Sequence, residues 1–337
     1  MKLLHTEEPV GIASRREFLT ESVGRAAGLA TALAVPCSTV HGANAVRGPI
    51  IDTHVHFYDP KRPEGVPWPR KGDERLYRRV MPDEWERLVA PCGPAGAIVV
   101  EASPWVEDNQ WLLDLAERHA ATLRGGMLGI VGVVGSLPLE DEASTALIDR
   151  FAEQQRFLGI RVHGEKLLIG LDDKGYAGRL ARLNDHGLTL DVNGGKVFDA
   201  VASVAKRFPT LRVVLNHMGN TSITKAGPLP EWLAAIDRVS QRPNVFMKVS
   251  ALVENAAHAM KLHTAPVDPT FYEPWLDAVW KAFGHERLMY GSNWPVSDRG
   301  GTYADMFAIT QLYVQRRGAE AECWFYSETS RAAYRWK

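Results

Sequence analysis

The sequence Ile50-Ile51-Asp52-Thr53-His54-Val55-His56 predicts a short β-strand that carries polar side chains at alternate positions. The period of two places Asp52, His54 and His56 on one face of that strand. Seven further apolar runs follow, separated by helical stretches, at residues 96–101, 126–134, 157–163, 188–193, 211–217, 245–250 and 288–292. Strands that alternate with helices of about ten or more residues pair in parallel, so eight of them predict an α/β fold of the (β/α)8 TIM-barrel type.

The predicted barrel accounts for most of the chain. The 337 residues are 45% hydrophobic and 23% charged, which excludes a disordered or fibrous protein. This length is compatible with two domains, but the eight repeats extend from residue 50 to the C-terminus, so we expect a single domain over residues 46–337. Residues 57–81 and 252–270 follow strands and exceed the usual length of a connection, which makes them candidate lids over the C-terminal mouth of the barrel.

The charges and the cysteines limit the partners of the protein. Lys and Arg number 39 against 40 Asp and Glu, a net charge of −1. No field therefore attracts nucleic acid or an anionic membrane surface, and we expect a small-molecule substrate as the partner. Three cysteines without CxxC spacing disfavour a zinc finger and a disulfide framework. A metal ion would bind to His and carboxylate side chains instead.

Residues 1–45 have the features of an export signal. Arg15 and Arg16 precede a mildly apolar, Ala- and Gly-rich run and then the small residues 43–45, the order of a basic region, an apolar region and a cleavage site. The run is too short for the ~20 residues that a membrane-spanning helix needs. The segment resembles a twin-arginine signal peptide, which implies export to the periplasm. An amphipathic helix of the folded domain and a lipoprotein signal at Cys37 are the alternatives.

Polar residues gather where the predicted strands end. His54 and His56, two positions apart on a strand, can supply two neighbouring ligands to a divalent metal ion, although hydrogen bonding within the fold also explains such a pair. Further polar residues end the later strands: Arg161, His163, Glu165, Asp191, Asn193, Asn216, His217, Lys248, Ser250 and Asn293. Inward polar groups cost free energy unless they are paired or bind a ligand, so together they predict a polar pocket at the C-terminal mouth of the barrel.

Five motifs resemble the amidohydrolase-related branch of the amidohydrolase superfamily. They are DTHVHFYDP at 52–60, PW at 67–68, NHMG at 216–219, KVSAL at 248–252 and FGHERLMYGSNWPVS at 283–297. The pattern is most similar to that of the fuconolactonase-like and pyrone-dicarboxylate-lactonase-like hydrolases. The resemblance implies an amidohydrolase-like barrel and an enzyme that opens a sugar lactone or a dicarboxylate lactone with an activated water.

The resemblance also assigns metal ligands and reveals departures from the family pattern. His54 and His56 match the histidine pair of the first strand, the candidate metal ligands, and His217 matches the histidine of the sixth. Asn293 stands where the family usually has an aspartate that serves as base and ligand, and an amide does not accept a proton at neutral pH. A binuclear centre is therefore not expected. One divalent cation, zinc, and metal-independent catalysis both remain open.

The roles implied for the remaining residues follow from the chemistry of lactone hydrolysis. His217 or His163 would act as the base, and Asn293 would orient water or substrate. Arg161 or Lys248 would hold the oxyanion or a substrate carboxylate. Further candidate substrate contacts are Trp68, Asp191 and Asn193. Two other functions stay open: a metal-dependent nonoxidative decarboxylase of an aromatic acid, which would lack its usual fifth-strand histidine and eighth-strand aspartate, and a ligand-binding barrel without catalysis.

Overall fold

The structure, a computed structural model, describes residues 48–123 and 125–337. The predicted signal peptide, residues 1–45, and the expected start of the domain at residue 46 lie outside the described residues. Within the described part, no helix is both long enough and apolar enough to cross a membrane. All eight predicted strands fall in this part of the chain.

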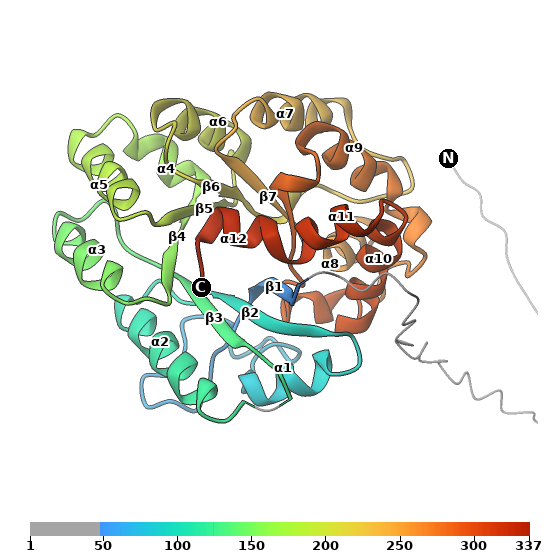
Figure 1. Cartoon of the computed structure of the whole chain (residues 1–337), viewed down its shortest axis with the longest axis horizontal. Coiled ribbons are helices and arrows are strands. Elements are labelled where there is room, and N and C mark those ends of the chain that lie inside the picture. Colours follow the sequence, from blue (N-terminus) through green and yellow to red (C-terminus); the bar gives the residue numbers. More distant parts are fainter. Residues whose placement is uncertain (1–47, 124) are drawn as a thin grey trace, which may run out of the picture. The chain divides into compact units, whose positions relative to one another are not determined.

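Eight parallel strands form one sheet in the order in which they occur in the sequence (Figure 1). They are β1 (Ile50–Val55), β2 (Pro94–Val100), β3 (Gly129–Gly135), β4 (Phe157–His163), β5 (Thr189–Asn193), β6 (Val213–Leu215), β7 (Val245–Val249) and β8 (Leu288–Tyr290). The chain after β8 returns to β1, because the backbone NH of His56 donates to the carbonyl of Trp294 at 2.9 Å and that of Asn293 donates to the carbonyl of His54 at 2.8 Å. This closure confirms the predicted (β/α)8 TIM barrel.

Most of the helices cover the outside of the barrel (Figure 1). Their apolar residues recur at helical spacing; in α9, for example, Trp275, Leu276, Val279, Trp280 and Phe283 are buried. The helices are α1 (Pro82–Val89), α2 (Val106–Ala120), α3 (Ser144–Ala152), α4 (Gly164–Gly170), α5 (Lys174–Asp185), α6 (Val197–Arg207), α7 (Pro230–Ser240), α8 (Leu252–Met260), α9 (Glu273–Phe283), α10 (Tyr303–Gln315), α11 (Ala319–Cys323) and α12 (Thr329–Tyr334).

The C-terminal segment closes the bottom of the barrel. Inward apolar side chains of the strands form a cluster of their own, and Ala333, Tyr334 and Trp336 pack against it. The hydroxyl of Thr189, at the start of β5, donates to the carbonyl of Ala333 at 3.0 Å. Figure 1 accordingly shows α12 across the centre of the ring of strands. The functional site is therefore expected at the opposite end of the barrel, where the strands finish.

One of the two candidate lids contains regular structure that was not expected. Residues 57–81 form no helix and only one isolated bridge, between Tyr58 and Val80, as expected of a long loop. Residues 252–270, in contrast, begin with α8, which buries Leu252, Val253, Ala256 and Ala257. The apolar side chains at this spacing form a helical face that packs on the barrel, so the assignment of the segment as a loop was wrong.

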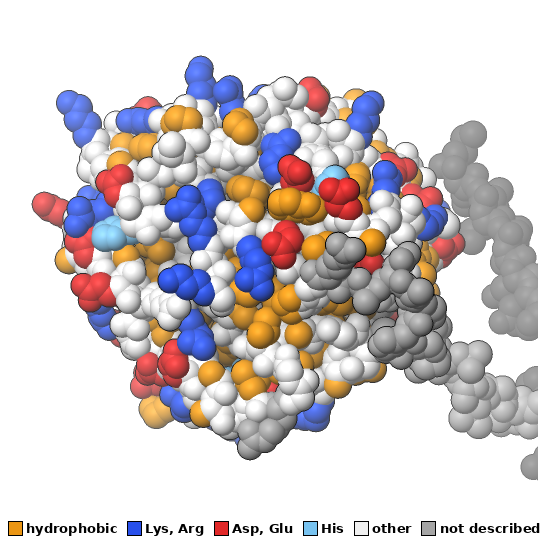
Figure 2. Space-filling model, in the orientation of Figure 1, with side chains coloured by type: hydrophobic (Ala, Val, Ile, Leu, Met, Phe, Trp, Pro, Cys, Tyr) orange, Lys and Arg blue, Asp and Glu red, His pale blue; other side chains and the backbone are white. Residues whose placement is uncertain are grey.

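The surface carries charges of both signs. Figure 2 shows Lys and Arg side chains interspersed with Asp and Glu side chains over the face in view. Many of the charged groups form exposed ion pairs, such as Arg182 with Asp149 at 2.5 Å and Arg238 with Asp199 at 2.6 Å. This mixed surface agrees with the small net charge of the chain.

Candidate active site

A polar cavity of about 790 Å³ lies at the C-terminal mouth of the barrel. Six of the residues predicted from the sequence line it: His56, Trp68, Arg161, Asn193, His217 and Asn293. They come from the ends of five strands and, in the case of Trp68, from the long loop after β1. The closed barrel brings these separate strand ends together, as the sequence pattern predicts.

Three histidines lie close together below and beside this cavity. The ring centroids of His54 and His217 are 4.3 Å apart, and those of His54 and His56 are 5.0 Å apart. His217 has a left-handed backbone, with φ of 56°, in the turn that follows β6, and its Nδ1 lies 2.8 Å from the hydroxyl of Ser250. The turn needs Gly219, because a Cβ at that position would lie 2.3 Å from the ring of Phe198.

All three imidazoles are neutral at neutral pH. Burial is the largest cause: it lowers the pKa of His56 to about 3 and places the pKa values of His54 and His217 well below the usual range. The positive charges of Arg161 and Lys248 act in the same direction. A neutral imidazole retains a lone pair, so each ring can accept a hydrogen bond.

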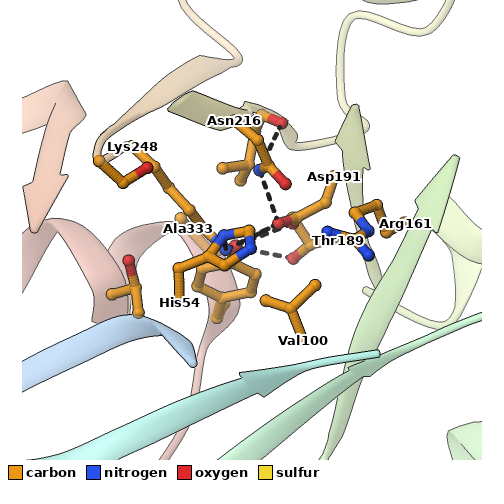
Figure 3. Close-up of polar contacts among 12 residues, drawn as sticks. His54, Val100, Arg161, Thr189, Asp191, Asn216, Lys248 and Ala333 are labelled. Carbon is orange, nitrogen blue, oxygen red and sulfur yellow. Dashed lines mark hydrogen bonds and ion pairs between the residues drawn. The ribbon is translucent and has the colours of Figure 1, made fainter. Parts of the chain in front are cut away.

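Lys248 and Asp191, two of the predicted substrate contacts, are not among the residues that line the cavity. Figure 3 shows them in a cluster of polar contacts with Asn216 and His54. Both side chains are fully buried, and the Nζ of Lys248 lies 2.8 Å from the Oδ2 of Asp191. Asp191 also accepts hydrogen bonds from Asn216 at 2.9 Å and from the hydroxyl of Tyr334 at 2.8 Å. The Nζ of Lys248 lies 3.4 Å from the Nδ1 of His54, so the pair contacts that histidine.

Arg161 and His163, two residues apart at the end of β4, occupy different places. The guanidinium of Arg161 donates to the side chain and to the backbone carbonyl of Glu101, both at 2.8 Å, and it lines the cavity. His163 lies outside the main cavity, where it lines a second hollow of about 410 Å³ and packs over Gly194. His163 is therefore not part of the main cavity, although Arg161 and Asn193 line this second hollow as well.

Asp52 does not join the polar face that the alternation of the first strand predicts. Its carboxylate accepts hydrogen bonds from the hydroxyl of Tyr303 in α10 and from the backbone NH of Ser292, both at 2.9 Å. The pairing of β1 with β2 shifts register between Asp52 and Val55, and this shift interrupts the period of two.

Glu254, in the first turn of α8, is a cavity residue that the sequence analysis missed. The amide nitrogen of Asn293 donates to its Oε1 at 2.7 Å, and the carboxyl is almost fully buried. Burial raises the pKa of Glu254 to about 7, although the bond from Asn293 opposes the shift. No motif marks this glutamate, and its partner follows it in the sequence by 39 residues.

Comparison with known proteins assigns the family. A family model for amidohydrolases matches residues 51–336. The chain belongs to the amidohydrolase family. This amidohydrolase is 30% identical over 259 residues to an L-fucono-1,5-lactonase of Burkholderia ambifaria, a match that covers 76% of this chain and 83% of the relative.

Two further comparisons agree with this assignment. An L-fucono-1,5-lactonase of Burkholderia multivorans is 28% identical over 288 residues, which is 81% of this amidohydrolase and 90% of the relative. A solved amidohydrolase structure from Burkholderia multivorans with bound zinc is 25% identical, with a TM-score of 0.73, and the match covers 86% of this chain and 100% of that one. The family resemblance stated from the motifs is thus confirmed.

The donor set of this amidohydrolase does not complete a zinc centre of the usual kind. Zinc sites in enzymes take about three protein ligands. The buried Nε2 of His54 has no hydrogen-bond partner within residues 48–123 and 125–337, and the Nε2 of His56 faces the Oδ1 of Asn293 at 3.3 Å. Among the described residues, however, no three His, Cys, Asp or Glu side chains are placed to share an ion. The positive charge of the Lys248 ammonium beside His54 also disfavours the binding of a metal cation there.

Proposed function

We propose that this amidohydrolase hydrolyses a sugar lactone to the open-chain hydroxy acid. The observation that carries the proposal is that the neutral, buried His217 and the guanidinium of Arg161 line one polar cavity. The two L-fucono-1,5-lactonases among the relatives support the same class of substrate. Four amide side chains in the lining suit the ring hydroxyls of a sugar, because an amide both donates and accepts hydrogen bonds: Asn193, Asn220, Asn255 and Asn293.

The proposed reaction is the attack of water on the carbonyl carbon of the lactone. With Nδ1 donating to Ser250, the Nε2 of His217 accepts the proton of the water as its oxygen bonds to the carbon. Arg161 stabilises the negative charge that develops on the carbonyl oxygen. The ring C–O bond then breaks, the leaving oxygen takes up the proton from His217, and the product is a hydroxy acid. Each of these steps uses a side chain of the described cavity.

A panel of substrates tests this function against the two alternatives. The purified protein is incubated with 1,4- and 1,5-lactones of sugars and with a dicarboxylate lactone, and acid release is measured at constant pH against the rate in buffer. We expect release above that rate with at least one sugar lactone. Carbon dioxide release from aromatic acids would instead indicate a decarboxylase. Thermal stabilisation by a sugar acid without turnover of any lactone would indicate a binding protein.

Removal of metal ions is expected to leave most of the lactone hydrolysis intact. The zinc-bound structure of the relative leaves a divalent ion on His54 and His56 as the competing assignment, but these residues do not complete such a centre here. The measurement is kcat/KM after dialysis against a chelator, with metal content determined in the same sample. Loss of activity that returns on addition of zinc would assign the metal site to these histidines.

We further propose that the protein is exported by the twin-arginine route, as the sequence of residues 1–45 suggests. Exchange of both Arg15 and Arg16 for lysine is expected to leave a precursor inside the cell, while the unaltered protein reaches the periplasm with Val46 as its first residue. Cell fractionation and N-terminal sequencing measure both results. Exported protein that begins at Met1 would contradict the proposal.

A further inference from the structure

Two hydrogen-bond acceptors face each other at the end of the barrel beside the cavity. The Nδ1 of His56 lies 2.9 Å from the carbonyl of Val100, which can only accept, so Nδ1 carries the proton of the neutral ring. The Nε2 of His56 therefore presents a lone pair toward the Oδ1 of Asn293, 3.3 Å away. The amide of Asn293 holds this orientation because its nitrogen donates to Glu254.

A single proton on Glu254 would remove the repulsion between these two facing acceptors. If the carboxyl of Glu254 is protonated, it can donate to the Oδ1 of Asn293, and the amide then turns its nitrogen toward His56. The chain of hydrogen bonds from Glu254 through Asn293 and His56 to Val100 is complete in that state. If Glu254 is ionised, the amide nitrogen must face the carboxylate, and the amide oxygen faces His56 and the cavity, as in the structure.

We propose that Glu254 is a positioning residue whose ionisation sets which end of the Asn293 amide faces His56 and the cavity. In the ionised state the Oδ1 of Asn293 accepts a hydrogen bond from the attacking water, and in the protonated state this acceptor is withdrawn. The consequence for water rests on the proposed lactone hydrolysis, whereas the coupling between the two side chains does not. The carboxyl releases its proton to solvent, and no further reactant is needed.

The surroundings of Glu254 favour titration near neutral pH. Its other oxygen, Oε2, is buried and has no hydrogen-bond partner among the described residues. The charges that face it oppose each other: Asp298 raises its pKa and Arg299 lowers it. Asp298 has its own raised pKa, about 6, and is paired with Arg78 at 3.2 Å. Tyr272 faces Glu254 as well, and burial raises its pKa so that it stays neutral.

The pH profile of kcat/KM tests the proposal on a lactone that the protein hydrolyses. We expect kcat/KM to rise with pH, which gives the profile an acidic limb, and to level off above about 7, the pKa of Glu254. In Glu254→Gln the neutral amide lets Asn293 take either orientation at every pH, so this limb should flatten. Asp298→Asn is the matched control, which removes the neighbouring carboxyl and should keep the limb. A Glu254→Gln variant that is less active but retains the limb would overturn the proposal.

A second measurement tests the coupling between Glu254 and Asn293 and does not depend on turnover. The ionisation of Glu254 is followed by NMR on protein labelled with ¹³C at the side-chain carboxyls of glutamate, and the signal is assigned by its loss in Glu254→Gln. We expect Asn293→Leu to move the midpoint upward, because the variant loses the bond that stabilises the carboxylate. An unchanged midpoint would overturn the coupling. A shifted midpoint in a protein that opens no lactone would support the coupling and refute the proposed function.

Discussion

Lys248→Met is expected to lower the free energy of unfolding by about 3–5 kcal/mol, the usual cost of removing one partner of a buried ion pair. The ammonium of Lys248 and the carboxylate of Asp191 are both fully buried, so the substitution would leave Asp191 charged in a site that water does not reach. Asn216 and Tyr334 would still donate to that carboxylate, which limits the loss. Urea unfolding followed by circular dichroism measures the change.

Two further variants show whether the effect comes from the buried charge. Lys166→Met removes a lysine that pairs with Glu140 at 3.2 Å on the surface, and we expect it to change stability by less than about 1 kcal/mol. Adding Asp191→Asn to Lys248→Met should recover part of the lost stability, because no unpaired charge then remains. If Lys248→Met unfolds at the same urea concentration as the unaltered protein, the buried pair does not have the assigned role.

Arg161→Met is expected to lower kcat/KM for a hydrolysed lactone by about hundredfold or more, the range seen when an oxyanion donor is removed. Glu101 fixes the guanidinium from two directions at 2.8 Å, so its orientation is set before the substrate binds. Lysine is not expected to replace it, because an ammonium lacks the planar set of donors. Steady-state kinetics on the best lactone of the panel gives the change.

The control for Arg161 is Arg156→Met, which removes an arginine that pairs with Glu117 at 2.6 Å on the outside of the barrel. We expect this variant to keep the unaltered kcat/KM. Because Arg161 also pairs with Glu101, the fold of Arg161→Met is checked by its melting temperature. A well-folded Arg161→Met with unaltered kcat/KM would rule out a role for the guanidinium in the transition state.

The strands could be predicted because each carries its signal within a few residues. The predicted run at 157–163 coincides with β4, whereas the run at 211–217 is longer than β6, which spans only Val213–Leu215. The strand there passes directly into the turn at His217. In the sequence, only Gly219 indicates that this turn has a left-handed backbone. The order and the closure of the barrel then follow from the number of strands.

The site was predictable in part, because alternation gives the face of a side chain but not its depth. Lys248 faces the barrel interior as expected, yet it does not line the cavity and meets Asp191 instead of solvent. Glu254 could not be found from the sequence, since its role depends on Asn293, which follows β8, and on its own burial in the first turn of α8. Only the assembled barrel brings such residues together.

His217 is the proposed base, and His163 is the histidine that the structure places outside the cavity. These two residues are suited to a paired comparison, because the sequence analysis gave them the same role. The melting temperature of each alanine variant is measured first, to check that the fold is retained. The value of kcat/KM for the lactone then distinguishes the roles of the two histidines.

The most direct test of the proposed active site is therefore kcat/KM for the best sugar lactone in His217→Ala and His163→Ala. We predict a loss of at least about hundredfold in His217→Ala, the low end for removing a general base, and a rate close to that of the unaltered protein in His163→Ala. Full lactone hydrolysis by His217→Ala, or a larger loss in His163→Ala, would contradict the assignment of the reaction to this cavity.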